Sequence, residues 1–68
     1  MNVDAWQAEL REAGWSIGDM AILTPAGLAW LVFGHCGEHR IVAKAPTQTD
    51  AWREAARLSV QIQRRRGR

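Results

Sequence analysis

Apolar residues recur at helical spacing near the start of the chain. Val3, Trp6, Leu10 and Ala13 follow one another at intervals of three, four and three positions, which places them on one face of a helix. Asn2 can cap this helix, and Gly14 can end it in a left-handed conformation, so that Trp15 can fold back on Leu10 or a neighbour. The pattern therefore predicts a short amphipathic helix at the N-terminus.

A second helical pattern covers the end of the chain. Pro46 ends the segment before it, Thr47 or Thr49 can cap the helix, and Asp50 favours its positive end. Its buried face is expected to consist of apolar and small residues, namely Trp52, Ala55, Ser59 and Ile62, flanked by Ala51, Ala56 and Leu58. Trp6 and Trp52 both fall on apolar stripes and are predicted to be core residues.

Three segments between the helices have the character of strands, at residues 19–24, 28–33 and 39–45. Pro25-Ala26-Gly27 is a plausible first turn, and Gly37 can take a positive φ in the second reversal, at residues 35–38. The order of elements predicts an α+β domain, with a three-stranded antiparallel sheet flanked by an N-terminal and a C-terminal helix (α-β-β-β-α). We assign residues 1–63 to this single domain and residues 64–68 to a basic tail.

The central strand is apolar on both faces. Leu28, Trp30 and Val32 point one way, while the alternate residues Ala29, Leu31 and Phe33 point the other. A sheet with both helices on one face normally shows water a polar second face. Either the helices cover both sides, or an apolar patch remains for another molecule. We expect Leu28, Trp30 and Val32 to form a protein interface.

Positive charge is concentrated at the C-terminus. The formal net charge of the chain is +2, but the last five residues contribute four arginines, so the preceding 63 residues carry −2. A helical continuation would align basic residues at intervals of three to four, and a row of guanidinium groups suits phosphate. The alternative nucleic-acid site therefore consists of Arg53, Arg57, Arg64, Arg65, Arg66 and Arg68.

Little in the sequence favours catalysis. No paired carboxylates, Gly-rich phosphate loop or Ser-His-Asp set can be identified, and a chain of 68 residues has scant room for a preformed pocket. The segment His35-Cys36-Gly37-Glu38-His39 contains potential metal ligands, but its spacing is not that of a zinc finger and it reads as a hairpin turn. We expect no catalytic residues, no metal and no cofactor.

The chain begins without a basic segment followed by an apolar one, so we expect no signal peptide. Its longest apolar stretch, residues 28–34, is too short to cross a bilayer. A single cysteine excludes an internal disulfide and fits a reducing compartment. A cytoplasmic location without membrane contact is the resulting expectation.

The order of elements resembles the double-stranded-RNA-binding domain. The resemblance is best over residues 38–58, where a third strand and Ala43-Lys44-Ala45-Pro46-Thr47 lead into an Ala-rich helix. In that family this junction is Gly-rich, and paired lysines at the helix start reach phosphates. Here Thr47-Gln48-Thr49-Asp50 holds an acid and no lysine, so the resemblance implies the topology without its phosphate contacts.

Residues 20–62 also resemble the β-β-β-α modules of HicB-type antitoxins. In those modules a strand runs through Thr or Ser into a helix that begins x-x-Glu-Ala, and here the segment is Thr47-Gln48-Thr49-Asp50-Ala51-Trp52. Such modules bind a toxin and often associate with one another, which implies a protein partner.

These observations lead to one expectation and one alternative. The expected function is that of a small non-enzymatic binding module, which pairs with itself as a dimer or docks on another protein, as an accessory protein of a phage or mobile element would. A domain this small gains stability from such burial. The alternative is a nucleic-acid-binding module that uses the arginines of the second helix and the tail.

Overall fold

A computed structural model describes residues 2–66 of the chain. The elements follow in the order α1 (Val3–Glu12), β1 (Ser16–Thr24), β2 (Gly27–Cys36), β3 (His39–Ala45) and α2 (Gln48–Arg66). The strands form one antiparallel sheet in the order β1-β2-β3. The predicted α-β-β-β-α fold is confirmed.

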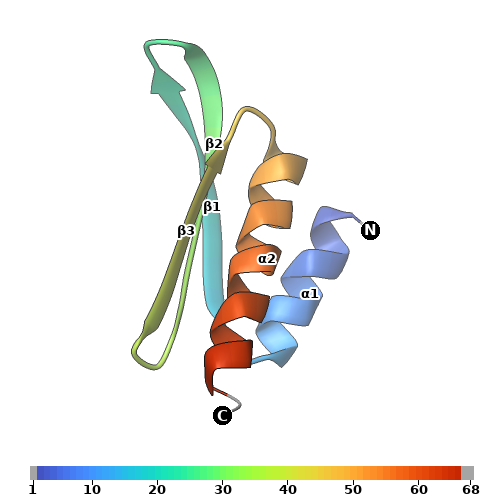
Figure 1. Cartoon of the computed structure of the whole chain (residues 1–68). Coiled ribbons are helices and arrows are strands. Elements are labelled where there is room, and N and C mark those ends of the chain that lie inside the picture. The colour runs from blue at the N-terminus through green and yellow to red at the C-terminus, as the bar shows by residue number, and fades with distance from the viewer. Residues whose placement is uncertain (1, 67–68) are drawn as a thin grey trace.

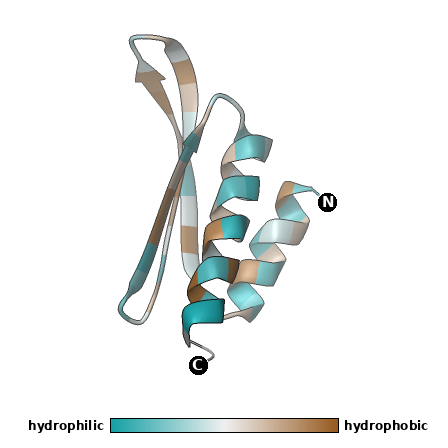
Figure 2. Ribbon diagram, viewed as in Figure 1, coloured by the Kyte–Doolittle hydropathy of each residue, from teal (hydrophilic) through white to brown (hydrophobic). Residues whose placement is uncertain are grey.

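Both helices lie on the same side of the sheet, as Figure 1 shows. α2 packs against β2 and β3, while α1 lies beside α2 and contacts β1. Figure 2 shows hydrophilic residues along much of both helices and more hydrophobic ones along parts of the strands. One face of the sheet is therefore covered by helices, and the other has no layer over it.

The ends of α1 follow from local chemistry. The Asn2 side chain accepts a hydrogen bond from the Ala5 N–H at 2.9 Å, which caps the helix. Gly14 has a φ of +95°, and the Trp15 N–H returns to the Leu10 carbonyl at 3.0 Å. This pair of features is the Schellman end that Gly14 and Trp15 predicted.

The first of the two candidate threonines caps α2. The Thr47 hydroxyl accepts a hydrogen bond from the Asp50 N–H at 3.2 Å, so Thr47 rather than Thr49 caps the helix. The helix continues through Arg66. The predicted boundary at residue 63 thus falls inside α2, and Arg68 lies outside the described residues.

Two strands are longer than the sequence indicated. β1 starts at Ser16 instead of residue 19, and β2 extends to Cys36. Ser16 and Gly18 are weak strand formers on either side of Ile17, but pairing with residues 33–35 of β2 extends the ladder through them. The second reversal is therefore confined to Gly37, which has a φ of +61°, and Glu38.

The core lies between the sheet and the helices. Trp52 is 1% exposed and Val32 is completely buried. The predicted placement of Trp6 and Trp52 in the core is confirmed, and Trp15 joins them. Ala51, Ala55 and Ala43 let the helix backbone approach the sheet closely. This packing decides which sheet residues remain accessible.

Candidate protein-binding surface

Strand pairing assigns every sheet residue to one of two faces, because residues directly opposite each other across a ladder share a face. Asp19, Val32 and Ala43 form one such row, and it faces the helices, since Val32 and Ala43 belong to the core. The neighbouring row faces away from the helices. We call that second side the open face; it consists of Ser16, Gly18, Met20 and Ile22 of β1, Ala29, Leu31, Phe33 and His35 of β2, and Arg40, Val42 and Lys44 of β3.

The structure places the three predicted interface residues on the helix side. Val32 is completely buried beneath the helices, so it has no surface available to a partner in the folded chain. Trp30 packs against the core and is only partly accessible. Leu28 remains 63% exposed, because β2 extends beyond the last pairing with β3, between Trp30 and Ala45.

Three other large apolar residues of the sheet are exposed on the open face. Met20 is 50% exposed, Phe33 42% and Val42 64%. They come from three different strands, and half-buried Leu31 lies between Met20 and Lys44 in the adjacent row. Large apolar side chains that remain exposed together are typical of interaction sites. The residues that the sequence predicted as an interface lie on the helix side, whereas Met20, Phe33 and Val42 lie on the open face.

Phe33 has a defined position on this face, over its cross-strand partner Gly18. A Cβ atom at Gly18 would lie 2.8 Å from Cε2 and 2.9 Å from Cζ of the Phe33 ring, which is closer than such contacts normally come. The ring therefore lies across the bare backbone of β1. An aromatic ring that covers a strand glycine in this way stabilises the pairing of the two strands.

All charged side chains on the open face are cationic. Arg40 and Lys44 flank Val42 along β3, and His35 pairs with Arg40 across the ladder. β1 contributes no charge to this face, since its one acid, Asp19, faces α2. The open face thus has an uncharged side along β1 and a basic side along β3.

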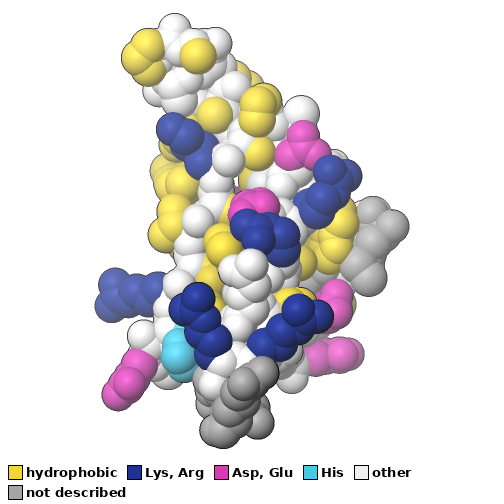
Figure 3. Space-filling view, viewed as in Figure 1, with side chains coloured by type: hydrophobic (Ala, Val, Ile, Leu, Met, Phe, Trp, Pro, Cys, Tyr) yellow, Lys and Arg dark blue, Asp and Glu magenta, His cyan; other side chains and the backbone are white. Residues whose placement is uncertain are grey.

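A second apolar group occupies the tip of the β1–β2 hairpin. Leu23, 85% exposed, pairs with Leu28 beyond the end of β3. Figure 3 shows hydrophobic side chains at this tip and along the sheet below it, where they alternate with Lys or Arg side chains; further Lys and Arg side chains lie over α2. A shallow depression of about 280 Å³ lies where β3 ends, beside Leu28, Ala29 and Lys44. The tip extends the accessible apolar surface past the helices.

The arginines of α2 are less available than their spacing suggested. Arg53 contacts Asp50 at 3.0 Å and its guanidinium lies 5.9 Å from the centre of the Trp6 ring. Arg57 donates two hydrogen bonds to Glu54. These bonds, together with the opposite charge, lower the pKa of Glu54 and raise that of Arg57. Two of the six arginines of the predicted row are therefore paired with acids of the same helix.

The remaining arginines lie at the other end of α2. Arg64 and Arg65 are exposed, and within residues 2–66 neither forms an ion pair. Arg66 is the last helical residue, and Arg68 falls outside the part of the chain that the structure describes. The structure thus groups two accessible arginines at the helix end and separates them from the paired ones.

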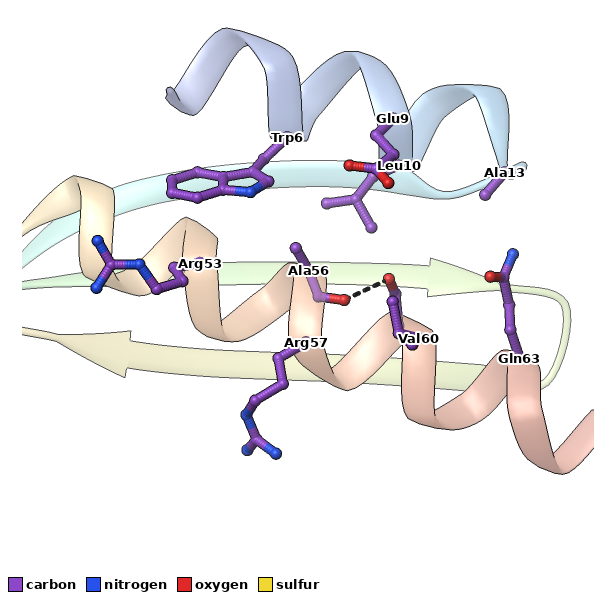
Figure 4. A pocket seen from close by; sticks show the side chains of 10 residues that line it. Trp6, Glu9, Leu10, Ala13, Arg53, Ala56, Arg57, Val60 and Gln63 are labelled. Carbon is purple, nitrogen blue, oxygen red and sulfur yellow. Dashed lines mark hydrogen bonds between the residues drawn. The ribbon is translucent and has the colours of Figure 1, made fainter. Parts of the chain in front are cut away.

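A groove of about 310 Å³ separates the outer surfaces of α1 and α2 (Figure 4). Trp6 and Leu10 of α1 and Ala56 and Val60 of α2 line its apolar part, while Glu9, Arg53 and Arg57 are at its edge. Its open, shallow form provides contact area but no enclosed site for chemistry.

The histidines of the second hairpin lie on different faces. His35 belongs to the open face with Arg40, whereas His39 pairs with Cys36 on the helix side. Within the described residues no group of three His, Cys, Asp or Glu side chains is placed to hold a metal ion. Because successive strand residues face opposite sides, the potential metal ligands of this hairpin are separated onto the two faces of the sheet.

Sequence reasoning overlooked the role of Asp19. One of its carboxylate oxygens, Oδ2, accepts hydrogen bonds from Gln48 Nε2 at 2.9 Å and from Trp52 Nε1 at 3.0 Å. It therefore ties β1 to the first turn of α2. The sequence contains one signal of this role, because Asp19 is an acid at a position on the apolar side of β1.

No protein-family model matches this chain, and no curated protein or solved structure is significantly similar to it. The α-β-β-β-α order does not by itself establish a relationship to either family that the sequence resembles. Within the described residues, neither helix is long and apolar enough to cross a membrane.

Proposed function

We propose that the chain is a small, non-enzymatic module that binds protein through the open face of its sheet. The observation that carries the proposal is the accessibility of Met20, Phe33 and Val42 on a sheet face without a covering layer. A half-exposed antiparallel sheet normally places polar residues on this side. Three large apolar residues there are best explained by a partner.

The size of this surface sets a limit on its affinity. Burying a large apolar side chain fully contributes about 1.5–3 kcal/mol, and roughly half of that remains to be gained at residues that are already half-buried. Met20, Phe33 and Val42 together would then contribute about 3–4 kcal/mol. Association costs at least about 4 kcal/mol in lost translational and rotational freedom. A stable complex must therefore also use the hairpin tip or main-chain hydrogen bonds.

The alternative of nucleic-acid binding through α2 has less support. Arg53 and Arg57 are paired with Asp50 and Glu54, so a phosphate would have to displace a carboxylate at each position. Arg64 and Arg65 are exposed and form no ion pair within residues 2–66, so a phosphate would meet no such competition there. Binding by this end would show steep salt dependence, because each neutralised phosphate releases counterions.

Photo-crosslinking in the cell of origin tests the proposal. A photoreactive phenylalanine at Val42 samples the open face, and the same residue at exposed Gln61 samples the outer surface of α2. We expect a discrete protein adduct from Val42 and none from Gln61. The adduct should be reproduced with the purified partner and weakened by Phe33→Ser. Adducts from Gln61 alone, or adducts with nucleic acid, would refute the proposal.

A further inference from the structure

The sheet has two free edges, β1 and β3. Each edge strand has backbone N–H and C=O groups on its outer side that no neighbouring strand satisfies, and such a row is a template for pairing with another chain. β1 is nine residues long and β3 is seven. The two edges differ in how they are protected.

β3 has the features that discourage pairing. It carries Arg40 and Lys44, and Pro46 follows its last residue. β1 contains no proline and no basic residue, and its single acid does not protect it. Asp19 faces the helices and is held there by Gln48 and Trp52. The long edge of the sheet is thus the unprotected one.

We propose that a second copy of this chain pairs antiparallel with β1 and so forms a continuous six-stranded sheet. This inference goes beyond the proposed function, because it uses the edge of the sheet rather than its open face. Main-chain hydrogen bonds along nine residues would supply the contacts that the apolar side chains alone do not.

The midpoint of β1 predicts which residues of the two copies lie opposite each other. Met20 is the middle residue of Ser16–Thr24, so a symmetric pair places Met20 opposite Met20 of the second copy. Asp19 then faces Ala21 of the other chain, which avoids two directly opposed carboxylates. Leu23, the most exposed apolar residue reported above, gains Ile17 of the other chain as its cross-strand neighbour.

The distribution of charge favours this pairing over stacking of the two open faces. Stacking would bring Arg40 and Lys44 against the apolar β1 or against the same cations of the second copy. In a six-stranded sheet the two β3 strands are outermost and about 24 Å apart, at five spacings of roughly 4.8 Å. Their repulsion is then screened at physiological salt, where the Debye length is about 8 Å.

The pairing also makes the uncharged sides of the two open faces contiguous. Met20 would lie opposite Met20 of the second copy and Ile22 opposite its Gly18, all on the same side of the sheet. The result is one apolar strip with basic residues along both outer strands. A partner of the open face would then meet a surface about twice as wide.

Sedimentation equilibrium over a range of protein concentrations tests the dimer. The wild-type mass should rise from 7.6 kDa to twice that value. Met20→Lys places two cations against each other at the axis and should weaken dimerisation by about tenfold or more. Val42→Lys adds the same charge to the same face but on β3, so it should leave the dimer unchanged. Circular dichroism should show that both variants are folded, since both sites are exposed.

Cysteine crosslinking tests the register in a Cys36→Ala background. Met20→Cys should form an intermolecular disulfide on mild oxidation, whereas Val42→Cys should not. Crosslinking of Val42→Cys alone would indicate pairing through β3, and crosslinking of both would indicate stacking of open faces; either result overturns the inference. A wild-type protein that remains monomeric at all concentrations also overturns it, but leaves the photo-crosslinking test of the open face unaffected.

Discussion

Removal of the Asp19 carboxylate should destabilise the domain more than its partly exposed position suggests. Trp52 is 1% exposed, and its Nε1–H donates to Asp19 Oδ2 at 3.0 Å. Within residues 2–66 no buried side-chain nitrogen or oxygen lacks a partner. Asp19→Ala would leave the indole N–H of Trp52 buried without a hydrogen-bond partner.

The expected cost can be estimated from this geometry. A buried donor that loses its partner costs about 1–3 kcal/mol, with the lower value applying if water enters the space of the lost carboxylate. A domain of 68 residues has roughly 3–10 kcal/mol of total stability at 0.05–0.15 kcal/mol per residue. The change is therefore a large fraction of the total, and each kcal/mol should lower Tm by about 4–8 °C.

Urea denaturation followed by tryptophan fluorescence measures this loss. Asp19→Asn keeps an acceptor oxygen at the same place and should recover a large part of the stability. Asp50→Ala is a matched control, since it removes an acid whose side chain is 49% exposed and whose ion pair with Arg53 is on the surface; its cost should be below about 1 kcal/mol. If Asp19→Ala destabilises the domain no more than Asp50→Ala does, the Asp19 carboxylate does not have this stabilising role.

Three further predictions concern single features. Gly14→Ala should cost about 1 kcal/mol or more in chemical denaturation, because the φ of +95° is unfavourable for any residue with a Cβ; an unchanged midpoint would contradict this. Gly18→Ala should displace the Phe33 ring, removing its NMR contacts with residue 18, while stability changes by less than about 1 kcal/mol, because the ring can move into solvent; a persistent ring position would argue against it. Arg57 lowers the pKa of Glu54 below its ordinary 4.5, so the ion pair stabilises the fold above that value and the contribution is lost as the pH falls through the folded-state pKa. Glu54→Gln should therefore reduce the drop in Tm between about pH 5 and pH 3, and an identical pH profile would exclude the pair as a source of stability.

Much of the fold can be predicted from the sequence because its signals are local. The spacing of Val3, Trp6 and Leu10 predicts the apolar stripe of α1, and Gly14 predicts its end, since a left-handed residue after a helix favours glycine. The alternation along β3 likewise identifies a strand. These features depend on residues that are neighbours in the sequence, within about one or two helical turns.

The candidate surface depends on contacts between distant residues and was assigned less well. β2 is apolar on both faces, so its own pattern does not distinguish the covered side from the open one. The packing of α2 makes that choice, burying Val32 and leaving Phe33 accessible. Leu28 is exposed for a different reason, since β3 ends before reaching it.

The elements, their order and the apolar excess on the central strand therefore follow from the sequence alone. The identity of the open face and the link that Asp19 makes between β1 and α2 depend on the tertiary structure. The physical reason is the range of the interactions. Backbone conformation is biased by near neighbours, whereas accessibility is set by whichever distant element covers a given side of the sheet.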